Sequence, residues 1–342
     1  MVVCGNTYIG GQHPISVQSM TTTDTRNAKA TINQIKELQD AGCDIVRLAV
    51  PNIEAAQTLS TIKKEINIPI IADIHFDYRL AIEAAKSGVD GLRLNPGNIG
   101  DRNRVKEIVK LAQSKNMKIR IGVNAGSLEK ELLIKYGKPT ADAMVESALA
   151  HIDILEELNF SNTVISLKAS NVQLTIDAYK KIAEKTNYPL HIGITEAGTI
   201  WGGTIKSSIG IGALLLQGIG DTIRVSLTGN PVQEVSVGRE ILKSLGLIKN
   251  EITIISCPTC GRCQIDLISL VNEIEEQIKE IKKPLKVAIM GCAVNGPGEA
   301  SDADIGIAGG VNSALLFKKG EIISRVPENE IIKILINEIN NM

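Results

Sequence analysis

Three cysteines near the end of the chain are spaced as ligands of one metal centre. Cys257, Cys260 and Cys263 form a C-x2-C-x2-C motif, and Cys292 follows 35 residues after the first of them. Thiolates at this spacing lie on one tight turn and can reach the same centre. Two chemistries fit such a set: a structural zinc ion held by four cysteines, or an iron–sulfur cluster that transfers single electrons.

The sequence around the fourth cysteine favours the cluster. Zinc ribbons usually pair two CxxC motifs, whereas here the second half supplies one cysteine in the loop GCAVNGPGEAS, residues 291–301. The glycines at 296 and 298 allow backbone amides to approach a cluster sulfide. Cys4 and Cys43 are isolated in the sequence, and we expect Cys43 to be a core residue.

A second set of chemically active residues consists of cations inside predicted strands. Arginines interrupt the apolar runs IVRLA, GLRLN, IRIGV and IRVSL, and a lysine ends a fifth run; these cations are Arg47, Arg93, Arg120, Arg224 and Lys168. Barrel strands are normally filled with branched apolar side chains. Because buried like charges repel each other, an anion must lie among the five cations. Two nearby carboxylates, Asp73 and Glu196, are too few to balance them, and a diphosphate suits five cations better than a monophosphate does.

Other polar residues lie at or near the predicted C-terminal ends of the strands, where barrel active sites are built. They are Gln18, Ser19, Asp73, His75, Asn124, Thr195 and Glu196. Glu196 is the best candidate for a general acid or base, because it is a carboxylate among cations. Its alternative role is an ion pair with one of the arginines. Pairing of every arginine with a neighbouring acid is the alternative explanation of the whole cation set.

Eight short apolar runs, each followed by a segment of helical period, must position these residues. The runs span residues 14–20, 44–50, 69–75, 91–96, 118–124, 163–170, 189–198 and 222–229. Strands that alternate with amphipathic helices predict a parallel sheet, and eight such units predict a (β/α)8 TIM-type barrel. An open doubly wound sheet is the alternative, weakened because no GxGxxG follows the first run.

The pattern changes after Gly246. The elements predicted there are a strand at 251–256, a charged helix at 266–281, a strand at 286–290, two or three further short strands and a helix at 329–341. We therefore expect an α/β chain of two domains with a very short linker. A TIM-barrel domain, residues 1–247, would bind the substrate, and a small α+β domain, residues 248–342, would hold a 4Fe–4S cluster.

Composition limits the classes of partner. The 342 residues are 44% hydrophobic with a net charge of −1, which is typical of a soluble globular protein and argues against a nucleic-acid or membrane-surface binder. The longest uncharged apolar stretch, residues 207–220, is too short to span a bilayer, and we interpret it as a buried helix. The first residues lack the features of a secretory signal, so six cysteines indicate a reducing, cytoplasmic compartment.

Motifs distributed over nearly the whole chain carry a family resemblance. In order they are PISVQSMT, IVRLAVP, ADIHF, GLRLNPGNIG, IRIGVNAGSLE, SLKAS, GITEAG, RVSLTG, SCPTCGR and GCAVNGPGEA. With them the chain closely resembles the 4-hydroxy-3-methylbut-2-enyl diphosphate synthases, reductases of the non-mevalonate isoprenoid pathway. The resemblance implies a two-electron reductive ring opening of 2-C-methyl-D-erythritol 2,4-cyclodiphosphate. The electrons would come from a flavodoxin or ferredoxin and pass through a 4Fe–4S cluster.

The resemblance also implies the site residues. The cluster ligands would be Cys257, Cys260, Cys292 and Glu299, which leaves Cys263 outside the set. The residues that bind the diphosphate would be Arg47, Arg93, Arg120, Asn124, Lys168, Arg224 and Ser226, with His75 and Glu196 close to the reacting carbons. Glu299 could yield its iron to a substrate oxygen, and Glu196 is the candidate proton donor for the departing hydroxyl.

Two other interpretations remain at this point. One is a phosphate-handling barrel enzyme, such as an aldolase or pterin-type transferase, with a structural zinc domain. The other is an iron–sulfur sensor or scaffold, which would not explain the five strand cations.

The order of the elements also predicts an assembly. The last barrel helix runs away from the active-site face, and a linker of about five residues spans at most about 18 Å. The cysteine motif therefore cannot easily reach the mouth of its own barrel. We expect a head-to-tail homodimer with twofold symmetry, in which the cluster domain of one subunit lies over the barrel of the other, as is described for the family.

Overall fold

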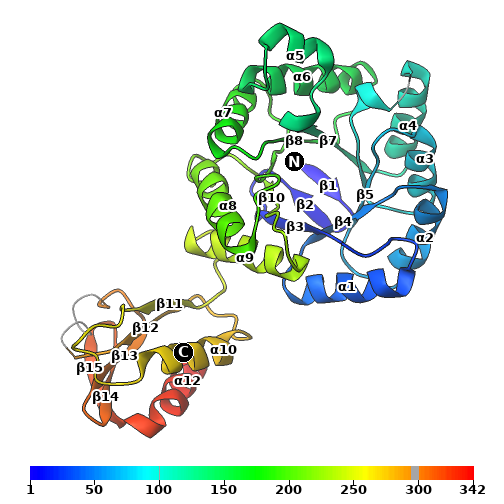
Figure 1. Ribbon diagram of the computed structural model, residues 1–342. Helices are drawn as coiled ribbons and strands as arrows, with labels where there is room; N and C mark the ends of the chain where they lie inside the picture. The colour runs from blue at the N-terminus through cyan, green and yellow to red at the C-terminus, as the bar shows by residue number, and fades with distance from the viewer. Residues whose placement is uncertain (100, 294–299) are drawn as a thin grey trace. The chain divides into compact units, whose positions relative to one another are not determined.

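The structure is a computed structural model that describes residues 1–99, 101–293 and 300–342. The chain divides into two compact units, Met1–Leu247 and Ile248–Met342 (Figure 1). The first unit is a barrel ringed by helices, and the second is a small sheet with helices against it. In the described ranges, no helix is long and apolar enough to cross a membrane.

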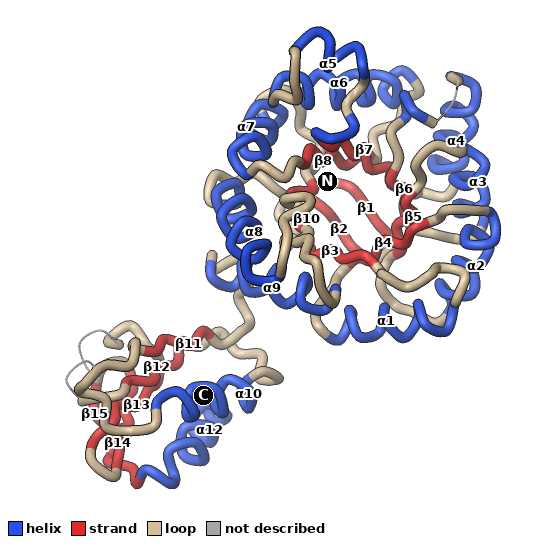
Figure 2. The backbone as a smooth tube through the Cα atoms, viewed as in Figure 1, coloured by secondary structure: helices blue, strands red, loops and turns tan. Residues whose placement is uncertain are grey.

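Eight parallel strands form the wall of the first unit (Figure 2). In spatial order they are β8 (Thr163–Lys168), β7 (Lys118–Asn124), β6 (Gly91–Arg93), β5 (Ile70–Asp73), β4 (Ile45–Ala49), β3 (Ser16–Met20), β10 (Thr222–Ile223) and β9 (His191–Ile192). A parallel bridge between Ile165 and Leu190 joins β8 to the start of the β9 segment, so the two ends of the sheet meet. The predicted parallel barrel is thereby confirmed, and the open sheet is not formed.

Helices follow the strands and pack around the outside of the barrel. They are α1 (Ala28–Asp40), α2 (Ile53–Lys64), α3 (Tyr78–Lys86), α4 (Arg102–Ser114), α6 (Ala141–Glu157), α7 (Val172–Ala183), α8 (Ile200–Leu215) and α9 (Pro231–Ser244). Short 3-10 turns η1 (Pro96–Asn98) and η2 (Ala125–Ser127) and a short helix α5 (Lys130–Tyr136) lie in the loops after β6 and β7. Most of the long helices begin at a polar side chain that accepts a backbone N–H of the first turn; these caps are Asn27, Asn52, Asp77, Asp101, Thr140, Asn171 and Asn230.

Two strands are much shorter than their apolar runs predicted. The sequence predicts strands at 189–198 and 222–229, but β9 and β10 pair over two residues each. A Cβ at Gly193 would lie 2.2 Å from the carbonyl oxygen of Arg224, so the backbones cross closely there instead of continuing the ladder. The residues beyond this crossing turn toward the mouth of the barrel and become available to the site.

An N-terminal hairpin, for which the sequence predicts no role, closes one end of the barrel. Strands β1 (Val2–Cys4) and β2 (Thr7–Ile9) pair antiparallel and appear inside the ring of strands in Figure 1. Buried side chains of the hairpin form one apolar cluster with residues at the beginnings of β4, β5 and β8, namely Ile45, Ile71 and Val164. Because barrel sites open at the C-terminal ends of the strands, this plug leaves the active-site end free.

The second unit has a five-stranded sheet in sequence order. Its strands are β11 (Thr253–Ser256), β12 (Lys286–Met290), β13 (Ile305–Gly310), β14 (Ser313–Lys318) and β15 (Glu321–Pro327). β11 pairs with β12 and β12 with β13 in parallel, whereas β13 pairs with β14 and β14 with β15 antiparallel. An apolar cluster lies between this sheet and the helices α10 (Leu267–Ile278) and α12 (Ile331–Asn341), the latter preceded by the turn η3 (Glu328–Glu330). This is the small α+β fold that the sequence predicts.

Candidate active site

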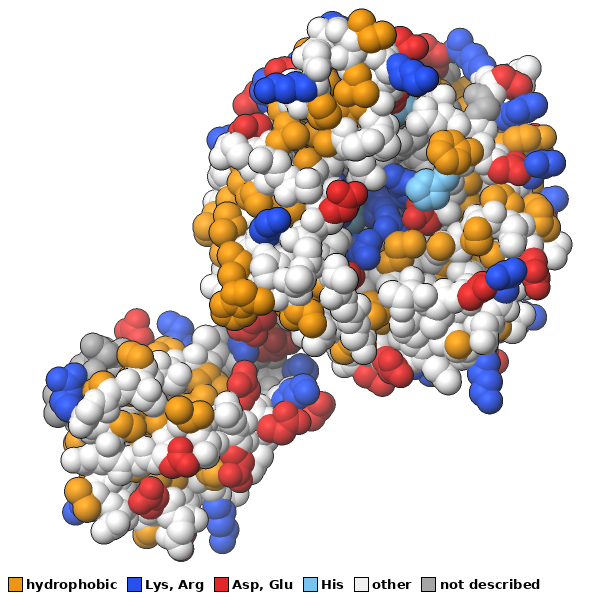
Figure 3. All heavy atoms as spheres, in the orientation of Figure 1, with side chains coloured by type: hydrophobic (Ala, Val, Ile, Leu, Met, Phe, Trp, Pro, Cys, Tyr) orange, Lys and Arg blue, Asp and Glu red, His pale blue; other side chains and the backbone are white. Residues whose placement is uncertain are grey.

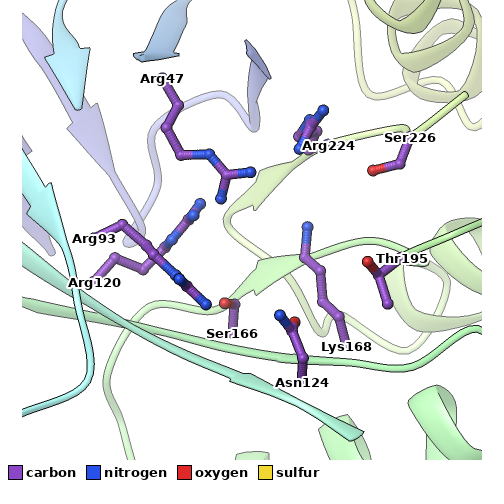
Figure 4. Close-up of a pocket in the computed structure, with 9 residues that line it drawn as sticks. All are labelled: Arg47, Arg93, Arg120, Asn124, Ser166, Lys168, Thr195, Arg224 and Ser226. Carbon is purple, nitrogen blue, oxygen red and sulfur yellow. The ribbon is translucent and has the colours of Figure 1, made fainter. Parts of the chain in front are cut away.

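A cavity rich in cations opens at the C-terminal end of the barrel (Figure 4). It is lined by Arg47, Arg93, Arg120, Asn124, Ser166, Lys168, Thr195, Arg224 and Ser226. The structure thus brings all five strand cations to one place. Figure 3 shows Lys and Arg side chains at the bottom of a hollow in this face, with acidic and histidine side chains beside them. The cavity itself has a volume of about 60 Å³ and is partly open to solvent.

Alternation along the strands and two glycines make this convergence possible. Inward-facing positions recur at every second residue of a strand. A long inward-facing side chain therefore passes over an inward-facing residue of the adjacent strand. A Cβ at Gly122 would lie 2.5 Å from Nε of Arg93, and a Cβ at Gly193 would lie 2.9 Å from Nζ of Lys168. For their path into the cavity, Arg93 therefore depends on a glycine in the adjacent strand, and Lys168 on the glycine that directly follows the adjacent strand.

Asp73, at the end of β5, is one of two buried carboxylates among the cations. Its oxygens lie 3.4 Å from Nη1 of Arg93 and 3.7 Å from Nε of Arg47. Burial raises the pKa of Asp73, but the nearby Arg47, His75, Arg93 and Arg120 outweigh it and hold this pKa well below its usual range. Asp73 is therefore ionised at neutral pH and neutralises one charge of the cavity.

The second buried carboxylate, Glu234 of α9, was missed by the sequence analysis, which named Glu196 in this place. Nε and Nη2 of Arg224 both donate to Oε2 of Glu234 at 3.3 Å, and Ser19 donates to the same oxygen. The other oxygen accepts the backbone N–H of Leu227 at 2.9 Å. Glu234 therefore holds both Arg224 and the segment that carries Ser226, and its position in a helix gave no sign of this in the sequence.

The remaining donors of the cavity are poorly matched by protein acceptors. Arg47 donates to the thioether sulfur of Met20 at 3.0 and 3.2 Å, a weak acceptor for a guanidinium. Arg120 donates to Gln18 at 2.8 Å, while its buried Nε has no partner among the described residues. Burial lowers the pKa of Arg47 to about 10, so it stays protonated at neutral pH. Two carboxylates against five cations leave an excess of positive charge, as expected for a site that receives a multivalent anion.

The two predicted acid–base candidates lie at the mouth and do not line the cavity. His75 is exposed, and its Nε2 lies 3.7 Å from Asp73. Glu196 is exposed beside the lining residue Thr195, and in the described part of the chain it makes no ion pair. Its φ of 51° is unusual for a residue other than glycine, and such conformations concentrate at functional sites. Ser166, which lines the cavity, was not predicted, although its alternation with Lys168 on β8 could have revealed it.

In the second unit, two thiols of the cysteine motif contact the segment before Cys292. The Cys257 sulfur accepts the N–H of Gly291 at 3.2 Å, and a Cβ at Gly291 would lie 2.5 Å from the Cys263 sulfur. Cys292 follows directly and is buried, whereas Cys260 is exposed. The predicted ligand Glu299 lies outside the described residues.

This donor set suits an iron–sulfur cluster in its chemistry. Soft thiolates are the ligands that Fe–S clusters and zinc both accept. Within the ranges that the structure describes, no three Cys, His, Asp or Glu side chains are grouped closely enough for one metal ion. Each thiolate of a 4Fe–4S cluster binds a different iron, so the ligands of a cluster stand farther apart than those of one ion. The cysteines thus have the thiolate chemistry that a cluster needs.

Comparison with known proteins identifies the family. The model of the GcpE TIM-barrel domain matches residues 1–239, and that of the GcpE protein C-terminal domain matches residues 253–341. The chain belongs to the GcpE family. It is 61% identical to a protein of Clostridium acetobutylicum and 60% identical to one of Clostridium perfringens, over 100% of this chain and 98% of each relative. Both relatives are named 4-hydroxy-3-methylbut-2-en-1-yl diphosphate synthase (flavodoxin), so the resemblance seen in the motifs is confirmed.

Among solved structures, the barrel of this GcpE protein is similar to a type I 3-dehydroquinate dehydratase of Clostridium difficile. The TM-score is 0.52 with 18% sequence identity, over 71% of this chain and 96% of that one. A likeness at this level of identity shows the barrel fold alone.

Proposed function

We propose that this chain catalyses the reaction of the 4-hydroxy-3-methylbut-2-enyl diphosphate synthases in isoprenoid biosynthesis. The substrate would be 2-C-methyl-D-erythritol 2,4-cyclodiphosphate, and the product (E)-4-hydroxy-3-methylbut-2-enyl diphosphate. The observation that carries the proposal is the cavity in which five cations converge with two buried carboxylates among the residues that the structure describes. Membership of the GcpE family supports the choice of this cyclic diphosphate over other phosphate esters.

The reaction balances with two electrons and one proton. The ring C–O bond to phosphate breaks and its electron pair stays on the phosphate oxygen. The neighbouring hydroxyl leaves with a proton as water, and the two added electrons complete the new carbon–carbon double bond. The diphosphate gains charge in this step, so the strand cations would stabilise the transition state more than the ground state.

The barrel residues would divide between binding and proton transfer. Arg47, Arg93, Arg120, Lys168 and Arg224 would hold the diphosphate oxygens, with Asn124 and Ser226 as neutral donors. Glu196 would donate the proton to the departing hydroxyl from the mouth, and His75 would lie close to the reacting carbons. Exposure of both side chains at the mouth supports these roles, because a ligand anchored below them would extend toward them.

A 4Fe–4S cluster, when bound, would supply the two electrons one at a time. We propose Cys257, Cys260, Cys292 and Glu299 as its ligands and the second unit, residues 248–342, as its domain. The electron donor would be a flavodoxin, as the names of the relatives indicate, or a ferredoxin, and the enzyme would work in the cytoplasm. Iron, sulfide and zinc analysis of protein purified without air tests this assignment. About four irons and four sulfides per chain are expected, whereas one zinc and no iron would contradict it.

Diphosphate binding itself is tested by titration with inorganic pyrophosphate and with phosphate. Calorimetry should give one pyrophosphate site per chain, with affinity that falls as salt rises and exceeds that for phosphate. Equal and weak binding of both anions would contradict the diphosphate site.

We further propose a head-to-tail homodimer, with the cluster domain of one subunit over the barrel of the other. Helices of such a barrel run back from the strand ends that carry the site, so the short connection after α9 starts away from the cavity, which supports the proposal. A band of apolar side chains on α8 supports a subunit contact on the barrel. Trp201, Ile205 and Ile209 are 79%, 43% and 56% exposed at four-residue spacing, on the side of the barrel where Figure 3 shows hydrophobic side chains gathered. Of the run at 207–220, predicted as a buried helix, residues 207–215 form the end of α8 and are mostly buried, whereas Ile209 and the residues that follow the helix are more exposed.

Mixing two inactive variants tests the shared site. C292S would lack a cluster ligand and R120M a cavity cation, so neither homodimer has a complete site. In a randomly reassorted mixture, each heterodimer contains one intact site, and about a quarter of wild-type activity should return. A mixture that stays inactive while heterodimers form would contradict the arrangement.

A further inference from the structure

His191, the first residue of β9, is a buried titratable group to which the function proposed above gives no role. Its side chain is 0% exposed, and it lies two inward positions before the lining residue Thr195. Apolar side chains usually fill such layers of a barrel. A fully buried imidazole inside a cation-rich barrel therefore calls for a specific partner.

The partner is the ammonium group of Lys168. Nε2 of His191 lies 3.1 Å from Nζ of Lys168, and Nδ1 lies 3.4 Å from Oγ1 of Thr222. An ammonium group can only donate, so Nε2 must accept and Nδ1–H is left to donate to Thr222. Burial and the cations Lys168, Arg120, Lys118 and Arg47 hold the pKa of His191 well below its usual range, in agreement with this neutral tautomer.

The surrounding backbone fixes the imidazole in place. The hydroxyl of Tyr179, from α7, donates to the His191 carbonyl at 2.6 Å and accepts the N–H of Leu167 at 3.0 Å, which ties β9 to β8. Gly193 leaves the space that Nζ of Lys168 crosses. Figure 4 shows the lysine side chain extending into the cavity toward Arg224.

We propose that His191 is a positioning residue for Lys168: the imidazole anchors one N–H of the ammonium, so that the other two point at the bound diphosphate. The inference rests on the diphosphate site proposed above. Burial and, after it, the charges of Arg120, Arg224 and Arg47 lower the pKa of Lys168. Its stem is flexible, so without an acceptor the direction of its ammonium group would not be fixed. A carboxylate could serve as the acceptor but would cancel the charge, as Glu234 does for Arg224. A neutral imidazole orients the ammonium group and does not cancel its charge.

The test compares variants that differ in the acceptor at this position. In H191Q, the amide oxygen can reach the place of Nε2, whereas H191L has similar bulk and no acceptor. Titration of the full chain with inorganic pyrophosphate should show an affinity about 10- to 100-fold weaker for H191L, the loss of one charged hydrogen bond, and close to wild type for H191Q. In the loaded enzyme, kcat/KM should fall by at least the same factor, and kcat should fall with it, because Lys168 also stabilises the charge that the diphosphate gains in the transition state. If H191L does not fold, H191N takes its place, because its shorter amide cannot reach Nζ.

A double-mutant cycle separates positioning from simple core packing. Once Lys168 is replaced by Met, adding H191L should not weaken pyrophosphate binding further, because His191 acts only through the lysine. Equal losses in H191Q and H191L, or an additional loss in the K168M background, would overturn the inference. Wild-type protein that does not bind pyrophosphate would instead overturn the proposed function, so the two failures are distinguishable.

Discussion

Replacement of Gly122 by Ala should disable Arg93 without altering any charged residue. The new Cβ would lie 2.5 Å from Nε, 2.9 Å from Nη2 and 3.1 Å from Cζ of Arg93. The backbone cannot move aside easily, because the Gly122 N–H is bonded to Asn95 and its carbonyl to Arg93 itself, both at 2.9 Å. The guanidinium must therefore shift by roughly 1 Å to reach ordinary contact distance.

That shift sets the size of the effect. A displacement of about 1 Å breaks the alignment of a charged hydrogen bond, which contributes about 1.5–3 kcal/mol. We therefore expect pyrophosphate to bind G122A about 10- to 100-fold more weakly than wild type. Because Arg93 can turn toward solvent at the open cavity, the melting temperature should change less than the affinity does.

The assay is calorimetric titration of wild type, G122A and a matched control. In G126A, the new Cβ meets nothing within 4 Å, although this glycine lies in the loop that follows the same strand. Wild-type affinity is expected for the control. Binding of pyrophosphate by G122A within twofold of wild type would refute the argument that Arg93 needs this glycine to reach the ligand.

Four further results follow from the contacts. E234Q leaves Arg224 buried without its counter-charge, so the free energy of unfolding should fall by about 3 kcal/mol. Added pyrophosphate should restore part of this loss, and stability equal to wild type would argue against the pairing of Glu234 with Arg224. D73N should lower the stability of the folded protein most at pH 7, and the loss should shrink as pH falls below about 4. The pKa of Asp73 is lowered in the folded state, so the ionised carboxylate stabilises the fold and its protonation removes that stabilisation. If thermal melts show the same loss at every pH, this role of Asp73 is contradicted. C263S should retain about four irons per chain whereas C257S loses them, and iron loss in C263S would show that this thiol is a ligand. I9A, in the hairpin that plugs the barrel, should lower the unfolding free energy by about 2–4 kcal/mol in urea titrations, and a loss below about 1 kcal/mol would mean that the plug is dispensable.

The barrel was predictable because its signals are local and repeated. Each apolar run is followed by an amphipathic segment, and alternation alone puts Arg93, Arg120 and Arg224 at inward positions of different strands. Parallel strands bring such positions to one end of the barrel, so convergence followed from the pattern. Cys257, Cys260 and Cys263 were equally visible, because a short motif needs no knowledge of the fold.

The parts that were missed depend on contacts between distant segments. Glu234 faces Arg224 only because α9 packs on β3, and its place in a helical pattern is that of an ordinary polar residue. In the sequence, the hairpin ending at Ile9 is only a polar, glycine-rich segment. Its role becomes visible from its packing against Ile45 and Val164, which are far away in the sequence. The shortening of β9 follows from the close crossing at Gly193, which propensity does not encode.

Turnover by the loaded enzyme tests the central claim most directly. Protein reconstituted with iron and sulfide is incubated without air with the cyclic diphosphate and reduced flavodoxin, and phosphorus NMR follows the two phosphate signals. The account predicts conversion of the cyclic signals into those of a linear diphosphate, with two flavodoxin electrons used per product and no conversion by R120M. An unchanged cyclic diphosphate in the presence of intact cluster and reduced donor would contradict it.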